Sequence, residues 1–278
     1  MLTKDQTERI EREAYLPEHL PDYVCAISGA EPFCFGDYLA YVGKGVLIFI
    51  GYPLGVSFDL NPLERKLAEA VKQCKPELVS LIAPAIPPSL GNGHLPSDQY
   101  YRLNLASVVF SQKTRNMLSR AGRELTVHAG RRFNPEHSRL VKDFIGRRSL
   151  DEATRTIFSG IDRYLDASPT ARIFEARNGA GEIVAFDVAE FMPRDYAFYM
   201  FNFNAADRYV PGASDLLLAR VIEQAVGDGK EYINLGLGIN PGVAAFKKKW
   251  GGVPFLPHAF HRYHPAGKGL LEMLLRGL

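Results

Sequence analysis

Cysteine is scarce in this chain of 278 residues, which argues against a scaffold held together by disulfides. The three cysteines, Cys25, Cys34 and Cys74, are odd in number and form no C-x-x-C pair. Such usage is typical of a reducing compartment. We therefore expect a cytoplasmic protein without disulfide bonds.

Long apolar segments are also missing. The longest apolar run, residues 45–51, is far shorter than the roughly 20 residues that a membrane-spanning helix needs. Residues 1–16 are charged and contain no apolar signal core. The sequence therefore predicts a soluble protein with no transmembrane segment.

Neither sign of charge dominates. The chain has 33 Lys and Arg residues and 31 Asp and Glu residues, a formal net charge of +2. A protein that binds nucleic acid through its bulk charge is usually more basic, so charge alone identifies no partner. Hydrophobic residues make up 46% of the chain, enough for the core of one large domain or two small ones.

Similar strand and helix patterns recur in the two halves of the chain. In the first half we expect strands at 23–27, 38–42, 46–50 and 78–83, and helices at 62–74 (capped by Asn61) and 107–121. In the second half we expect strands at 171–177, 182–191, 196–203, 231–237 and 255–263, and helices at 135–148, 151–166, from 214 onward and 243–250. We interpret the halves, 1–121 and 122–278, as tandem copies of one α/β unit, the first degenerate. The alternative is a single α/β domain behind an unrelated N-terminal segment.

The stretch 196–252 carries most of the chemical information. Its first strand leads into a Pro211-Gly212 turn, after which Ser214 is expected to cap a helix. The unpaired N–H groups and the dipole of a helix N-terminus favour negative charge, so this turn can hold an anion or phosphate. For these few residues alone, a routine turn and cap is the alternative.

The order of these parts resembles the acyl-donor half of the GCN5-related N-acetyltransferase (GNAT) superfamily. In that family the loop reads Gln/Arg-x-x-Gly-x-Gly/Ala. Here Tyr209-Val-Pro-Gly-Ala-Ser keeps the central Gly212 and replaces both flanking positions, and Arg208 is one residue out of register. The resemblance covers about residues 122–265. It implies an α/β (α+β) protein whose two GNAT-like units each contain a mixed, largely antiparallel sheet flanked by helices.

A second motif refines this resemblance. Where GNAT enzymes often carry a tyrosine as general acid, this chain has Phe246, and Lys247 follows. The Phe-Lys-x-x-Trp-Gly-Gly pattern resembles the Fem-type aminoacyltransferases and the C-terminal domain of phosphatidylglycerol lysyltransferases, which are tandem GNAT proteins that use aminoacyl-tRNA. An ammonium here would stabilise a developing oxyanion or neutralise a phosphate. For Lys247, Lys248 and Lys249 as a run, the alternative is a solvated helix end.

The resemblance implies acyl transfer to an amine by direct attack, which requires a general base. Asp187 and Glu190 lie among apolar neighbours on opposite faces of a strand, where desolvation would raise the pKa of a carboxyl group. Tyr199 on the next strand is a third candidate. A hydrogen-bonded core position is the alternative for each of the three.

Three hypotheses for the ligand remain open. An acyl-CoA donor is favoured by its frequency in the superfamily and by the absence of a strongly basic surface. An aminoacyl-tRNA donor is favoured by Phe246 and Lys247, and a catalytically inactive ligand-binding or regulatory protein by the altered loop. In the first two cases the expected acceptor is a small-molecule or lipid amine. The expected donor-binding residues are Phe201, Asn202, Phe203, Arg208, Tyr209, Val210, Pro211, Gly212, Ala213, Ser214, Gly236, Gly238 and Asn240.

Two further patterns are weaker. His258, His261 and His264 have an H-x-x-H-x-x-H spacing, but on a strand His261 faces away from the other two, so we expect no metal site. Residues 111–120 predict a basic helix that either meets phosphate or forms a solvated face.

Overall fold

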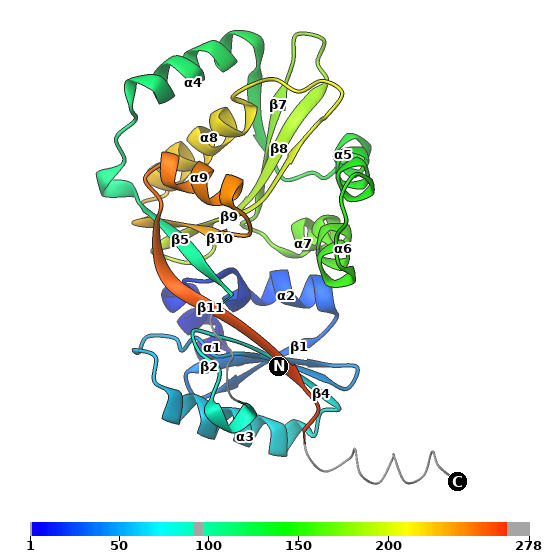
Figure 1. Ribbon diagram of the computed structural model, residues 1–278, viewed down its shortest axis with the longest axis vertical. Coiled ribbons are helices and arrows are strands. Elements are labelled where there is room, and N and C mark those ends of the chain that lie inside the picture. The colour runs from blue at the N-terminus through cyan, green and yellow to red at the C-terminus, as the bar shows by residue number, and fades with distance from the viewer. Residues whose placement is uncertain (1, 92–96, 266–278) are drawn as a thin grey trace. The chain divides into compact units, whose positions relative to one another are not determined.

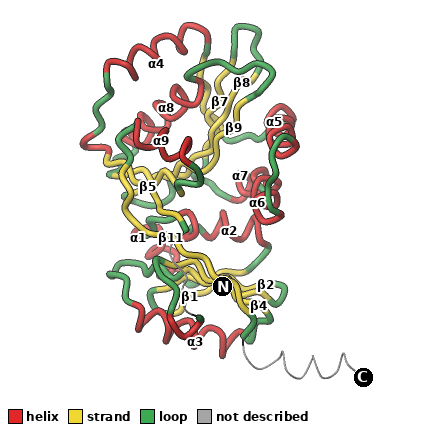
Figure 2. Tube along the Cα trace, viewed as in Figure 1, coloured by secondary structure: helices red, strands yellow, loops and turns green. Residues whose placement is uncertain are grey.

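The computed structural model describes residues 2–91 and 97–265 (Figures 1 and 2). Its helices are α1 (Lys4–Glu13), α2 (Pro21–Ser28), α3 (Leu60–Cys74), α4 (Gln112–Glu124), α5 (Pro135–Gly146), α6 (Glu152–Ser159), α7 (Ile161–Ala167), α8 (Ala213–Gly227) and α9 (Pro241–Lys249). Its strands are β1 (Glu31–Phe35), β2 (Tyr38–Gly43), β3 (Val46–Ile50), β4 (Leu78–Ala83), β5 (Asp98–Asn104), β6 (Thr126–Gly130), β7 (Arg172–Arg177), β8 (Ile183–Glu190), β9 (Tyr196–Asn204), β10 (Tyr232–Leu237) and β11 (Val253–Tyr263).

The chain forms two compact units that differ from the predicted domains 1–121 and 122–278. Of the described residues, the first unit comprises 2–14, 18–91, 97–100 and 254–265, and the second comprises 15–17 and 101–253. Helix α4 belongs to the second unit because it packs on α8. Strand β11 belongs to the first because it pairs with β4.

The first unit has a mixed sheet in the order β1-β2-β3-β4-β11. All its pairs are antiparallel except β3 with β4, which are parallel and are connected through α3. Leu63, Leu67 and Ala70 are spaced to fall on one face of α3, and all three are buried in the core cluster against the sheet.

The second unit has a sheet in the order β5-β10-β9-β8-β7-β6. Strands β6 to β9 pair antiparallel, β9 and β10 pair parallel, and α8 connects these last two. Figure 1 shows α8 and α9 on one face of this sheet and α5, α6 and α7 on the other. Helix α8 buries its apolar stripe, Leu217, Leu218, Val221, Ile222 and Ala225.

Both units repeat one topology, as the sequence predicted. The succession β1-β2-β3-α3-β4 in the first unit corresponds to β7-β8-β9-α8-β10 in the second. The last strand of each sheet comes from the other half of the chain. Strand β11 completes the first sheet beside β4, and β5 lies beside β10 in the second.

Three local predictions are wrong. Residues 23–27, expected as a strand, lie in α2, because a short apolar run fits either a helix or a strand. Asp59, and not Asn61, caps α3, since its side chain accepts the Asn61 N–H. Helix α8 is preceded by Gly212 with φ of 88°, and Ser214 lies inside its first turn.

Helix α9 ends in a Schellman motif built from Gly251 and Gly252. The Gly252 N–H donates to the Lys247 carbonyl at 2.9 Å, and the Gly251 N–H donates to that of Lys248 at 3.0 Å. Gly251 has φ of 87°, a left-handed conformation that side chains disfavour. The two glycines of the motif therefore stop α9 directly after its lysines.

We expect Gly252→Ala to destabilise the second unit. A Cβ at this position would lie 2.7 Å from Leu235 Cδ1 and 2.8 Å from the Lys247 carbonyl oxygen, so backbone must shift. The free energy of unfolding should fall by about 1–3 kcal/mol, the usual cost of overpacking. Denaturant unfolding followed by circular dichroism measures this loss.

Gly227→Ala is the matched control. A Cβ there meets nothing within 4 Å, and the residue is the last of α8. This change should raise the free energy of unfolding by up to about 1 kcal/mol. Equal changes in the free energy of unfolding for the two variants would contradict the close packing around Gly252.

Candidate active site

Strands β9 and β10 separate partway along their length. They pair at Tyr196, Ala197 and Phe198 of β9, opposite residues 232–234 of β10, and the paired register ends there. Just beyond, β9 carries a bulge against β8 whose register leaves Met200 without a cross-strand partner. Because a bulge bends its strand, β9 turns away from β10 after Phe198. We call this divergence the fork.

The Lys247 side chain reaches from α9 into the fork. It is 4% exposed, and its Nζ donates to the Leu237 carbonyl of β10. An ideal Cβ on Gly236 would lie 3.6 Å from this Nζ and 3.9 Å from the Tyr199 carbonyl oxygen of β9. The ring centroid of Tyr101 lies 5.9 Å from the ammonium, within range of a cation–π interaction. The glycine therefore leaves room for a buried cation between the two strands.

Helix α9 is fixed at both ends. At its start, the Asn240 side chain accepts the Val243 N–H at 3.0 Å. Past its end, the Trp250 indole N–H donates to the Asp215 carboxylate of α8 at 2.8 Å, and Lys249 Nζ lies 2.5 Å from the same oxygen. Lys249 is therefore ion-paired, although its side chain remains exposed.

Asn234 is a buried anchor of the fork that the sequence analysis missed. It is 0% exposed; its amide donates to the Tyr15 carbonyl at 2.8 Å and accepts the Gly236 N–H at 2.8 Å. The second bond holds Gly236 in its φ of 77° conformation. The one available signal was a single amide within an otherwise apolar strand.

Asp187 is fully buried beneath α8. Asn202 donates to its Oδ1 at 2.5 Å, and Asn204 and Ser214 extend this network to the first turn of α8. Within the described chain, Asp187 Oδ2 and the Tyr199 hydroxyl are buried without a hydrogen bond of good geometry. Burial raises the pKa of Asp187 well above its ordinary value of 3.8, despite Asn202 and Tyr199 beside it.

Glu190 lies on the opposite face of β8 and is fully hydrogen-bonded. Its Oε2 accepts the hydroxyls of Tyr164 and Ser168, both at 2.7 Å. Its Oε1 accepts the N–H groups of Phe191 and Met192 at 2.8 and 3.0 Å. This carboxylate fastens the end of β8 to α7, and the structure keeps it apart from Asp187.

The Gly212 loop leaves the first turn of α8 without a side-chain cap. An ideal Cβ on Gly212 would lie 3.2 Å from Met117 Cγ and 3.3 Å from Ala121 Cβ, so α4 packs directly on this loop. Gly212→Asp would therefore strain the backbone and displace α4 as well as place a carboxylate near the turn. That substitution cannot separate folding from ligand binding.

The remaining predicted site residues are dispersed. Phe201 and Phe203 pack edge-to-face against Phe158 in an aromatic cluster, away from the Asp187 network. Tyr209 is 62% exposed, and the Gly238 carbonyl accepts the Asn240 N–H in the turn before α9.

The half-buried ring of Phe246 packs on the core, with Lys249 Nζ 5.0 Å from its centroid. Val210, Pro211 and Ala213 form the turn into α8, where Ala213 N–H donates to the Val210 carbonyl.

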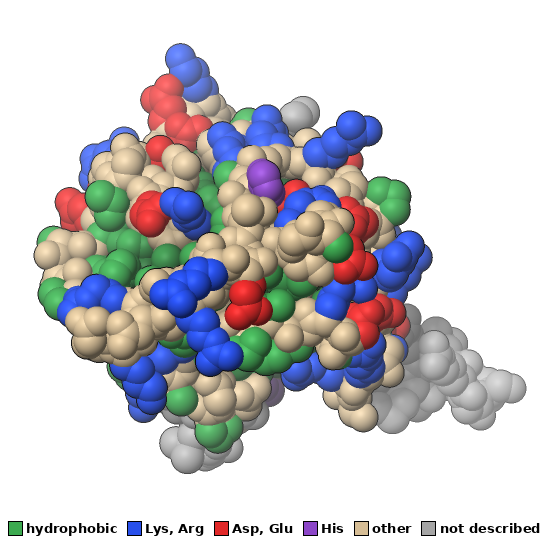
Figure 3. Space-filling model, turned by 90° about the horizontal axis from the view of Figure 1, so that it is seen from above, with side chains coloured by type: hydrophobic (Ala, Val, Ile, Leu, Met, Phe, Trp, Pro, Cys, Tyr) green, Lys and Arg blue, Asp and Glu red, His purple; other side chains and the backbone are tan. Residues whose placement is uncertain are grey.

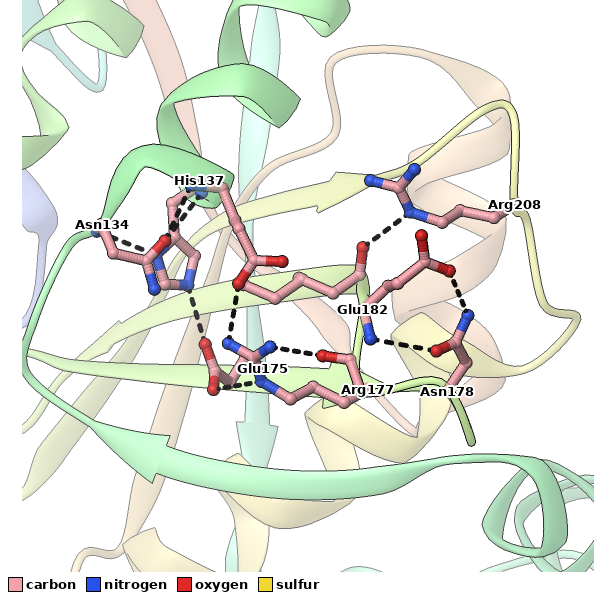
Figure 4. A network of polar contacts seen from close by, with 10 residues as sticks. Asn134, His137, Glu175, Arg177, Asn178, Glu182 and Arg208 are labelled. Atoms are coloured by element: carbon pink, nitrogen blue, oxygen red, sulfur yellow. Dashed lines mark hydrogen bonds and ion pairs between the residues drawn. The ribbon is translucent and has the colours of Figure 1, made fainter.

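A separate polar network ties the start of α5 to the β7–β8 hairpin (Figure 4). His137 is 1% exposed; its Nδ1 accepts the Asn134 N–H at 3.1 Å, so the proton of the neutral ring resides on Nε2, 3.1 Å from Glu175. Burial lowers the pKa of His137. Arg208, expected near the donor, donates to the Ile183 carbonyl in this network. These contacts are structural.

The three C-terminal histidines have separate surroundings. His258 packs edge-on against Tyr100, His261 stacks on Tyr263, and His264 Nδ1 lies 2.7 Å from the Glu77 carbonyl oxygen. Across residues 2–91 and 97–265, no group of His, Cys, Asp and Glu is arranged to hold a metal ion. Nor does that part of the chain contain a helix long and apolar enough to cross a membrane.

The buried Asp187 carboxyl predicts a specific pH dependence. Its pKa is higher in the folded than in the unfolded state, so the native protein holds this proton more tightly. As pH rises above about 4, the unfolded chain ionises first, and the free energy of unfolding decreases by up to about 1.4 kcal/mol per pH unit. Asp187→Asn removes this decrease and should gain stability relative to wild type between pH 4 and 7.

Urea unfolding of both proteins across this pH range measures the difference. Glu190→Gln is the control, because it alters a carboxylate of the same strand that is already hydrogen-bonded at both oxygens. Parallel stability profiles of wild type and Asp187→Asn would show that Asp187 is ionised in the folded protein.

No family model and no curated protein matches this sequence. Solved structures do match it. The structure of L-PGS from Bacillus licheniformis aligns with a TM-score of 0.64 and 16% identity, covering 99% of this chain and 96% of that one. FemX aligns with a TM-score of 0.66 and 11% identity, covering 99% and 98%.

A tandem GNAT protein from the clavulanic acid biosynthesis pathway aligns with a TM-score of 0.53 and 12% identity, covering 83% of this chain and 79% of that one. Identities this low establish a common fold and nothing finer. The chain therefore has the tandem GNAT-like fold that L-PGS and FemX also have, as the resemblance of its Gly212 loop and Phe246-Lys247 motif predicted.

Proposed function

We propose that this protein is a transferase that moves an acyl or aminoacyl group to an amine by direct attack, and that Lys247 acts at the reacting centre. The observation that carries the proposal is the ammonium buried in the fork. A fixed cation in a site that excludes water stabilises developing charge far better than one in solvent, because it needs no reorganisation.

The proposed role of Lys247 follows from the charges in the reaction. Attack by an amine places negative charge first on the donor carbonyl oxygen and then on the departing atom. Phe246 has no proton to give, and the Tyr199 hydroxyl lies beside Asp187. Lys247 is therefore the group at the fork that supplies a positive charge and a hydrogen-bond donor.

Neither predicted carboxyl group suits the role of general base. Asp187 is fully buried beneath α8 and its Oδ1 already accepts the Asn202 amide, so the carboxyl group is not accessible to an attacking amine. Glu190 already accepts four hydrogen bonds. In this proposal the proton released by the attacking amine passes to the departing atom of the donor.

As donor we propose an aminoacyl ester of tRNA, the second of the sequence-based hypotheses. The departing oxygen of an ester is more basic than the sulfur of a thioester, so it gains more from a neighbouring ammonium. The Gly212 loop retains only one position of the GNAT pattern, and α4 packs against it. The likeness in fold to L-PGS and FemX supports the same choice.

An acyl-CoA remains the second candidate donor. One observation favours it: the first turn of α8 has no side-chain cap, so its N–H groups are available to a diphosphate. Thermal unfolding in the presence of acetyl-CoA, long-chain acyl-CoA or aminoacyl-tRNA tests both candidates, because a ligand that binds the folded state raises its stability. Stabilisation by a CoA ester alone would reverse our preference.

Lys247→Met should lower turnover about a hundredfold or more, the usual loss when one preorganised donor is removed from a transition state. The melting temperature should change little, because methionine retains most of the apolar stem in this buried position. Lys248→Met is the matched control, since Lys248 is the exposed neighbour on the same helix. Transfer is measured by mass spectrometry of the amine acceptor with each donor class.

Wild-type turnover in both variants would remove Lys247 from the mechanism. Loss of turnover in both would point to the charge of the helix as a whole. Lys249 is unsuited as a control because it pairs with Asp215.

A further inference from the structure

Cations are dense along the sequence of α4, β6 and the two residues that follow β6. Between residues 113 and 132 the chain has six Lys or Arg residues and a single acidic residue, Glu124. All six cations are exposed. They define what we call the α4–β6 surface: Lys113, Arg115, Arg120, Arg123, Arg131 and Arg132. Figure 3 views the molecule from above, the side on which α4 lies in Figure 1, and shows Lys and Arg side chains spread over this face with Asp and Glu side chains among them.

Three of the four cations of α4 are arranged along one side of the helix, and Arg115 lies on a different side. Lys113, Arg120 and Arg123 are separated by seven and three residues, which places them on a common face. The other face is directed inward, where Thr114 and Ala121 are buried. From Lys113 to Arg123 the cationic face extends over about 15 Å of helix. This length suits a row of phosphates better than one phosphate group.

Acidic partners are missing around these cations. In the described chain no ion pair with a carboxylate involves any residue of the α4–β6 surface. Arg115 donates to the Phe110 carbonyl and Arg131 to the Ser168 carbonyl. By contrast, Arg177 and Arg194 of the same unit pair with Glu or Asp. In a chain of net charge +2, this is a local concentration of positive potential, which attracts a polyanion.

The composition of the surface favours a phosphodiester backbone over a lipid bilayer. Five of its six cations are arginines, whose planar guanidinium groups bind phosphate through two hydrogen bonds. A helix that lies in a membrane presents large apolar side chains to it. None is exposed between residues 113 and 132, and Met117 of α4 packs instead on Gly212.

We propose that the α4–β6 surface binds the phosphate backbone of a structured RNA. That this RNA is the donor tRNA rests on the function proposed above. The link is geometric: Met117 and Ala121, on the inner face of α4, contact the Gly212 loop at the start of α8. RNA bound on the outer face of α4 therefore lies on the helix whose inner face packs against the Gly212 loop, where we expect the donor.

The test compares two triple variants that each remove three positive charges. The first is Lys113→Gln, Arg120→Gln and Arg123→Gln. The control is Arg65→Gln, Lys72→Gln and Lys75→Gln, three exposed cations on and directly after α3 of the first unit. Fluorescence anisotropy measures binding of labelled, deacylated tRNA over a series of salt concentrations, and circular dichroism checks that both variants fold.

The α4 variant should bind tRNA about tenfold or more weakly, and its log–log salt slope should decrease by about one for each phosphate that the surface no longer neutralises. The control should stay within about twofold of wild type. The proposal is overturned if wild type does not bind tRNA, or if the two triple variants bind it equally. It is also overturned if the protein binds phosphatidylglycerol vesicles and not tRNA.

Lys247→Met separates this proposal from the proposed function. This variant should bind deacylated tRNA with wild-type affinity, since Lys247 is 4% exposed. If it also transfers at the wild-type rate while the α4 variant loses tRNA binding, the RNA surface stands and the catalytic role fails. If it is inactive while the α4 variant binds normally, the catalytic role stands and the surface fails.

Discussion

The burial of one ammonium group, that of Lys247, constrains much of the second unit. Removing a cation from water is costly, so the fold must supply partners for it. The Leu237 carbonyl is available because β10 has diverged from β9, and the Tyr101 ring lies within cation–π range. Gly236 leaves space for the ammonium, and Gly252 allows α9 to end against β10. The position of the Lys247 ammonium thus depends on the bulge in β9, the conformation of Gly236 and the end of α9.

Local sequence patterns predicted the parts of the fold that depend on neighbouring residues. Apolar runs between turn signals identified β7, β8 and β9, and helical spacing identified α8, because the apolar residues that each element buries are close together in sequence. The domain boundary was not predictable in the same way. It depends on β11 pairing with β4, a contact between segments some 180 residues apart in sequence that leaves no periodic signal.

In the candidate site, too, only the features that depend on neighbouring residues were predictable from the sequence. The position of Lys247 follows from a motif, and the motif depends on local geometry, the Schellman end of α9. Asp187 and Glu190 had equivalent sequence patterns, yet one carboxyl is buried with an unbonded oxygen and the other accepts four hydrogen bonds. Partners such as Ser168 and Asn202 come from other elements, so only the assembled sheet distinguishes the two residues. Lys249 illustrates the same point, since its partner Asp215 lies on α8.

The exchange of terminal strands between the repeats affects how the chain can fold during synthesis. On the ribosome, β1 to β4 emerge first, but the edge of β4 has no partner until β11, the last described strand, has been made. For most of translation the nascent chain therefore exposes an open strand edge, the kind of surface that promotes association between chains. Such long sequence separation also slows folding, because the intervening loop must close before the pairing stabilises it. A gene cut between the two repeats would encode two fragments, each lacking a strand that only the other can provide.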